Sequence, residues 1–166
     1  MNSTHLEEDF PNLHKEEFKV TSPATDRPNC IGWAFYDYSQ FWDPSMIGVR
    51  GYYWPPGVPR DDSLESWIRV FEIHGYCKCE SADLQSDSEK IAIYATIDGT
   101  PQHVARQKSS GVWVSKLGKS EDIEHNSLDA LGGELYGTVV RIMRRPRLPG
   151  ASEEYTGSAN TNPQKV

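Results

Sequence analysis

The chain has 166 residues, of which 37% are hydrophobic and 11% aromatic, and this composition suits one globular domain with a modest core. Its net charge of −7 at pH 7 and sequence pI of about 5.2 argue against nucleic acid or an anionic membrane surface as a partner. No apolar run is long enough to span a membrane, and the polar start of the chain lacks the apolar core of a signal peptide. We therefore expect a cytoplasmic protein, whose three cysteines do not form a disulfide framework.

The first regular element that the sequence predicts is a helix that begins at Cys30. Pro28 favours an extended chain before the helix, and Asn29 suits the N-cap because its side chain can accept a hydrogen bond from the first helical turn. The apolar residues 31–35 predict a central, buried helix, which we expect to end near Asp37. A thiol at a helix N-terminus lies close to backbone N–H donors, which favour the reactive thiolate. Cysteines are also often buried only to fill space, so a structural role stays open.

Residues 39–60 are rich in aromatic residues, proline and glycine, and they predict an irregular loop that packs through its own rings. Two interpretations of this aromatic loop stay open. It either seals the core as a surface flap, or it forms a wall beside Cys30 that shapes a substrate cleft, with Tyr53 and Trp54 as contact residues.

An amphipathic helix is predicted next, and Gly75 ends it. Its apolar face is formed by Leu64, Trp67, Ile68 and Phe71. Cys77 and Cys79 follow on one face of a predicted strand. Zinc sites normally use a wider Cys spacing and two further ligands, so we expect no metal site and no cofactor here.

The second half of the chain predicts an antiparallel sheet. Alternating apolar residues and turn sequences predict strands at residues 90–97, 102–107, 112–118 and 136–143, with a helical turn at 127–131. Helices followed by these strands indicate an α+β fold. We expect a single domain at residues 10–146, a disordered N-terminus at residues 1–9 and a disordered tail at residues 147–166.

His103 follows a tight turn at the start of a predicted strand, where its side chain can face the N-terminus of a helix packed on the sheet. A thiolate–imidazolium pair needs this geometry, with the imidazole within hydrogen-bond reach of sulfur and a third polar group to orient the ring. We therefore predict that Cys30 is a nucleophile and that His103 is its general base.

The order of these residues resembles the papain-like fold, in its compact NlpC/P60 and CHAP branch. In that branch a Cys starts a helix, and a His-Val-(Ala/Gly) step opens a following strand, as His103-Val104-Ala105 does here. The resemblance implies an enzyme that cleaves amide bonds, often in cell-wall peptides. The third residue follows on the next strand in the family, and the matching position here is Ser115, where the family prefers His, Asn, Asp, Glu or Gln. Asp122 and Glu124, from the loop after that strand, stay open as alternatives.

Trp113 and Ser115 share one face of their predicted strand because side chains alternate. Trp113 is large and apolar, so we expect the Cys30 helix to cover this face. Ser115 is then carried inward, toward the edge where His103 lies, and must find a hydrogen-bond partner there.

The chain also resembles a group of short, functionally uncharacterised bacterial proteins over residues 10–146. The shared pieces are Phe-Pro-Asn-Leu, Asn-Cys-Ile-x-Trp-Ala, Tyr-Trp-Pro, His-x-Ala-Arg-Gln and Gly-x-Trp-x-Ser-Lys-Leu-Gly, with Ile-Glu-His at the end. This second resemblance implies no activity.

Three hypotheses about function follow. The first is a cysteine hydrolase or acyltransferase that acts on an amide bond of a peptide or protein, with the backbone N–H of Cys30 in its oxyanion hole. The second is an inactive papain-like binding module that uses the aromatic loop as its contact surface, and the third is an unrelated α+β domain. The candidate substrate-binding residues are Asn29, Trp33, Tyr53, Trp54 and Trp113.

Overall fold

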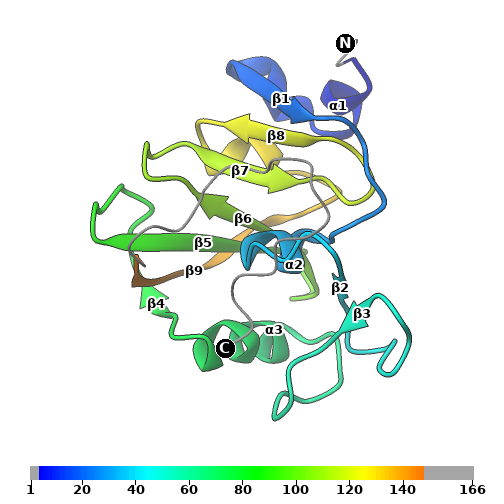
Figure 1. The fold of residues 1–166 in the computed structure, drawn as a ribbon. Coiled ribbons are helices and arrows are strands. Elements are labelled where there is room, and N and C mark those ends of the chain that lie inside the picture. The colour runs from blue at the N-terminus through cyan, green and yellow to red at the C-terminus, as the bar shows by residue number, and fades with distance from the viewer. Residues whose placement is uncertain (1–3, 148–166) are drawn as a thin grey trace.

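The computed structural model describes residues 4–147, which form an α+β fold as predicted (Figure 1). The helices are α1 (Thr4–Asp9), α2 (Cys30–Ala34) and α3 (Leu64–Ile73), with 3-10 helices η1 (Pro11–Lys15) and η2 (Leu128–Leu131). The strands are β1 (Phe18–Ser22), β2 (Phe41–Trp42), β3 (Tyr52–Tyr53), β4 (Cys77–Cys79), β5 (Ser88–Ala95), β6 (Pro101–Gln107), β7 (Trp113–Lys116), β8 (Asp122–His125) and β9 (Thr138–Pro146).

Seven strands form one sheet in the order β1-β8-β7-β6-β5-β9-β4, and every neighbouring pair is antiparallel. The predicted meander of β5, β6 and β7 lies at its centre. β6 and β7 pair only where Arg106 faces Val114 and Gln107 faces Trp113. The start of β6, which carries His103, therefore extends beyond its paired part on the β7 side.

Each face of the sheet has its own apolar core, because successive side chains of a strand point to opposite faces. One core packs α2, α3 and the aromatic loop against Ile93 and Val104. The other packs α1, η1 and η2 against Tyr94 and Trp113. His103 pairs with Tyr94 and therefore points to this second face. Figure 1 shows α2 in front of the middle of the sheet, and α2 contacts β6 and β7.

The short helix α2 is fixed at both ends by polar contacts. Asn29 caps its start, since its side-chain oxygen accepts hydrogen bonds from the backbone N–H groups of Gly32 and Trp42. Asp37 is fully buried after its end and accepts a hydrogen bond from the Trp42 indole at 3.0 Å. A Cβ atom at Gly32 would approach the carbonyl oxygen of Gln40 to 2.9 Å, so the close return of the chain requires glycine. This return ends the helix earlier than the sequence predicts and holds Cys30 at its first turn.

Other differences from the sequence-based expectations bear on the site and its surroundings. Residues 4–9 form α1 instead of a disordered end, because Leu6 is buried in the core of the second face. Residues 122–125 form β8 instead of a loop, because β1 and β7 pair with them on both sides. Trp113 is covered by α1, η1 and η2 rather than by the Cys30 helix. The predicted tail beyond residue 147 lies outside the described residues.

Candidate active site

Cys30 is the first residue of α2, and its side chain is 9% exposed between α2 and the sheet. Burial raises the pKa of its thiol to about 11. The backbone N–H groups of Val104, Ile31 and Cys30 itself lower this pKa, but by less than burial raises it. The predicted N–H donors are therefore present, and the thiol is nevertheless protonated at neutral pH.

His103 lies on β6 and is 1% exposed. Its ring stacks on the ring of Tyr136, with centroids 4.3 Å apart and planes 3° from parallel. Its Nε2 atom lies 2.9 Å from Oγ of Ser115, one of the three candidate orienting residues. Burial and then the neighbouring His125 lower the pKa of His103 well below its usual value, so the ring is neutral.

Ser115 connects His103 to a second buried histidine. Nε2 of His125 lies 2.8 Å from Oγ of Ser115, and Nδ1 of His125 lies 2.8 Å from the carbonyl oxygen of Ser127. Ser115 is fully buried and His125 is 1% exposed. A continuous chain of hydrogen bonds thus runs from β6 through β7 and β8 to the residue before η2; we call it the His–Ser–His chain.

Cys30 on α2 contacts β6 next to His103. In the part of the chain that the structure describes, no hydrogen bond joins the two side chains. The thiol interacts with the backbone N–H of Val104, the residue directly after His103. The Cys30 side chain belongs to the core on the Val104 side of the sheet, whereas the His103 ring points to the other side. Desolvation therefore leaves a neutral thiol and a neutral imidazole at the resting site, in place of the predicted thiolate–imidazolium pair.

Asp122 and Glu124, the alternative orienting residues, lie on β8 and do not contact His103. Side chains alternate along β8, so both point away from the face that carries His125. Glu124 forms an ion pair with Lys108 at 2.8 Å. The structure therefore brings Ser115, and neither carboxylate, to the His103 ring.

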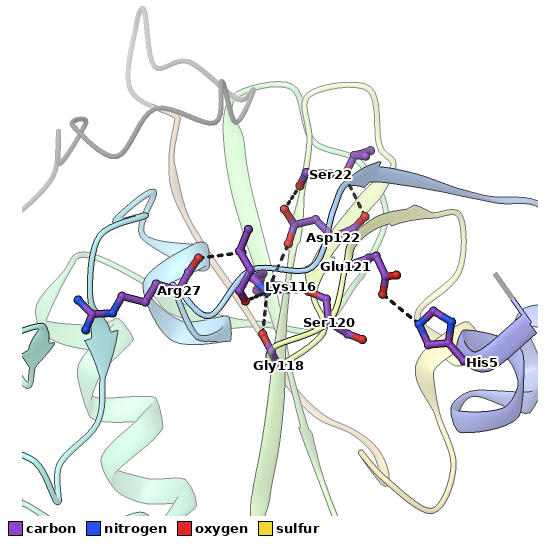
Figure 2. A network of polar contacts seen from close by, with 10 residues as sticks. His5, Ser22, Arg27, Lys116, Gly118, Ser120, Glu121 and Asp122 are labelled. Carbon is purple, nitrogen blue, oxygen red and sulfur yellow. Dashed lines mark hydrogen bonds and ion pairs between the residues drawn. The ribbon is translucent and has the colours of Figure 1, made fainter. Parts of the chain in front are cut away.

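Asp122 belongs instead to a buried polar network around Lys116 (Figure 2). Its carboxylate accepts a hydrogen bond from Ser22, and one oxygen lies 3.9 Å from Nζ of Lys116. The Lys116 ammonium donates hydrogen bonds to the carbonyl oxygens of Gly118 at 2.7 Å and Ser120 at 2.8 Å. Burial raises the pKa of Asp122 and lowers that of Lys116.

The predicted substrate-binding residues near Cys30 mainly hold the fold. Asn29 caps α2, and Trp33 is 3% exposed. Trp54 is buried, and its indole donates a hydrogen bond to the carbonyl oxygen of Pro59 at 3.1 Å. Tyr53 is partly exposed on the aromatic loop.

Trp113, the fifth candidate, lines a cavity of about 380 Å³ on the face that carries His125. The other lining residues include Gln107, Asn126, Ser127 and Asp129. The carbonyl group of Ser127 ends the His–Ser–His chain, so the cavity and the chain share this residue.

The three cysteines are free thiols. Cys77 is exposed and Cys79 partly buried on the edge strand β4, where the Cys79 thiol lies 3.3 Å from the carbonyl oxygen of Ser81. Among residues 4–147, no three His, Cys, Asp or Glu side chains lie together as metal ligands would.

Sequence reasoning missed His125 and Tyr136, which complete the surroundings of His103. His125 could have been placed only if β8 had been recognised, since the strand at residues 122–125 puts His125 opposite Trp113. For Tyr136 no local signal existed, since the ring reaches His103 from the segment between η2 and β9.

Comparison with known families gives one match: residues 19–144 match a family described as Domain of unknown function (DUF7689). Neither the curated proteins nor the solved structures yield a match. In the described part of the chain, no helix has the length and apolar character needed to cross a membrane.

Proposed function

We propose that this chain, which belongs to the family described as Domain of unknown function (DUF7689), is a cysteine hydrolase or acyltransferase for amide bonds of a peptide or protein. We also propose a papain-like arrangement, with Cys30 at a helix start and His103 and Ser115 on successive strands. The observation that carries the proposal is the hydrogen bond between His103 Nε2 and Ser115 Oγ. It uses one ring nitrogen for orientation and leaves Nδ1 for proton transfer, next to the residue whose backbone N–H interacts with the thiol.

In the proposed reaction, Nδ1 of His103 takes the proton of the Cys30 thiol while sulfur attacks the carbonyl carbon of the amide. The C–N bond then breaks, and the amine leaves with that proton. Water gives a proton to His103 and its oxygen attacks the thioester, which releases a carboxylic acid and restores the thiol. An amine in place of water gives acyl transfer. The backbone N–H of Cys30 stabilises the oxyanion.

In the proposed mechanism, transfer of the thiol proton to His103 and attack by sulfur are coupled, because neither group is charged before substrate binds. Both groups are neutral and buried, so no ion pair has to be maintained without substrate. Substrate binding must bring the thiol and the imidazole into contact, as catalytic hydrogen bonds often tighten only in the bound complex.

The test is acylation and alkylation of Cys30, followed by mass spectrometry. The protein is treated with p-nitrophenyl acetate or iodoacetamide at pH 7, and each cysteine is quantified separately. We expect His103→Gln to slow modification of Cys30 by roughly 100-fold, because general-base assistance is typically worth 10²–10⁴. Exposed Cys77 is the internal control and should react equally in both proteins. Equal rates at Cys30 in both proteins would contradict the hydrolase proposal.

A second candidate is a binding module without catalysis, and one observation favours it. The aromatic loop exposes Met46, Ile47 and Val49 at 36%, 37% and 45%, beside the stacked rings of Phe41 and Tyr52. Apolar side chains gathered on one exposed loop are typical of interaction surfaces. If this candidate is right, serine at positions 46, 47 and 49 abolishes peptide binding in a peptide-array assay, and His103→Gln leaves it unchanged.

A further inference from the structure

We propose that His125 is a positioning residue that sets the tautomer of His103 through the hydroxyl of Ser115. The inference rests on the proposed function, because it concerns the group proposed as general base. It assigns a role to a residue that does not touch Cys30, and it identifies which nitrogen of His103 carries the proton.

The proton positions follow from the direction in which each hydrogen bond can run. The carbonyl oxygen of Ser127 can only accept, so Nδ1 of His125 carries the hydrogen in that 2.8 Å contact. In a neutral imidazole the other nitrogen, Nε2, is then an acceptor. The hydroxyl hydrogen of Ser115 must point to it across 2.8 Å.

The same constraint continues to His103. Ser115 has a single hydroxyl hydrogen, which is already donated to His125, so its oxygen is the acceptor in the 2.9 Å contact with His103. Nε2 of His103 therefore carries the hydrogen, and Nδ1 is left with a lone pair. A nitrogen with a lone pair is what a general base requires.

Burial of the three side chains favours this one set of proton positions. Ser115 is fully buried and both histidines are 1% exposed, so water does not compete for these hydrogen bonds. The far end of the chain is also fixed, because a carboxylate oxygen of Glu16 accepts a hydrogen bond from the backbone N–H of Ser127 at 3.1 Å. The carbonyl group of Ser127 is thereby held toward the His125 ring.

Removing the acceptor at position 125 reverses the direction of the hydrogen bond between Ser115 and His103. In His125→Phe, the only acceptor left for the Ser115 hydroxyl within the His–Ser–His chain is Nε2 of His103. An O–H donated to this nitrogen requires the His103 hydrogen to move to Nδ1, which removes the lone pair. In His125→Gln, a side-chain amide oxygen can still accept from Ser115, so this conservative variant should keep the wild-type tautomer.

The experiment is ¹⁵N NMR of histidine side chains, which distinguishes the two neutral tautomers. In the wild-type protein we expect His103 with hydrogen on Nε2 and His125 with hydrogen on Nδ1. In His125→Phe, His103 should change to the Nδ1–H form, and Cys30 alkylation should slow by about tenfold or more. His125→Gln should restore both readouts, and His14→Gln, at an exposed histidine outside the His–Ser–His chain, is the control.

Two results would overturn the inference: an Nδ1–H form of His103 in the wild-type protein, or an unchanged His103 tautomer in folded His125→Phe. If His125→Phe does not fold, an Nδ1–H form of His103 in the wild-type spectrum would still overturn the inference. A changed tautomer together with an unchanged Cys30 alkylation rate supports the role of His125 and contradicts the hydrolase proposal instead, so the two failures are distinguishable.

Discussion

Replacing Lys116 with methionine should destabilise the protein strongly. The Lys116 side chain is fully buried, and its ammonium donates to the carbonyl oxygens of Thr25, Gly118 and Ser120 at 2.7–3.0 Å. Its Nζ atom also lies 3.9 Å from a carboxylate oxygen of Asp122 (Figure 2). Methionine fills similar space but leaves these three carbonyl oxygens without the ammonium donor and Asp122 without the nearby ammonium charge. Loss of one partner of a buried ion pair costs about 3–5 kcal/mol.

This loss of about 3–5 kcal/mol is large compared with a total free energy of unfolding of about 5–15 kcal/mol for a domain of this kind. At about 2–4 °C per kcal/mol, the midpoint of thermal unfolding should fall by roughly 6–20 °C. Urea unfolding followed by tryptophan fluorescence measures the free energy directly. Lys119→Met is the matched control, since this exposed lysine lies three residues away on the turn that follows β7, and its replacement should cost less than about 0.5 kcal/mol.

The pH dependence of this variant gives a second, independent test. Burial already raises the pKa of Asp122 in the folded state, and removal of the ammonium raises it further. The folded variant then binds more protons than the unfolded chain above about pH 4, so its stability falls as pH rises. Adding Asp122→Asn should abolish this fall and recover part of the lost stability. A cost no larger than that of Lys119→Met, or no dependence on pH, would refute the reasoning.

Three further predictions concern other buried groups. Burial lowers the pKa of His103 and His125, so the unfolded chain binds more protons below about pH 6.5; stability measured by urea unfolding should fall as pH decreases through this range, and less steeply in His125→Gln. Arg106→Lys should cost about 2 kcal/mol in thermal unfolding, because the guanidinium lies 3.9 Å from the Tyr36 ring centroid and an ammonium does not stack in this way; a loss below 0.5 kcal/mol would contradict it. The rate of Cys30 alkylation should rise with pH up to about 11, and a rate that levels off at about pH 8.5, as for a free thiol, would contradict the burial argument.

The sequence predicts the central part of this fold because its signals are local. The Asp98–Gly99 turn joins β5 to β6, and the apolar periodicity of α3 is confined to ten residues. The N-cap at Asn29 is local too, and it is confirmed by the hydrogen bond from Gly32. β8 could not be recognised in the same way. Three of its four residues are polar, and a segment of this kind reads as a strand only when its partners on both sides are known.

In the candidate site, too, local features were predicted and features that depend on the whole fold were not. Alternation within β7 predicts that Trp113 and Ser115 share a face and that Ser115 points inward, where it needs a hydrogen-bond partner. In the structure that partner is His103, together with His125. Alternation does not tell which layer covers that face, and in a sheet with a core on both sides the assignment to α2 is wrong. The pKa of the Cys30 thiol could not be predicted for a similar reason. The sequence reveals the helix N-terminus at Cys30, but desolvation depends on residues contributed by the whole chain.

The position of β1 has a consequence for biosynthesis. Phe18 pairs with His125, about 100 residues later in the chain, and β1 has β8 as its neighbour at that edge of the sheet. At a synthesis rate of roughly 5–20 residues per second, the N-terminal strand waits about 5–20 s for its partner to be made. During this time its backbone N–H and C=O groups are open to pairing with another chain. A ribosome-bound chain stopped before residue 122 should therefore be cut readily by protease between Phe18 and Ser22, and one stopped well after residue 125 should resist.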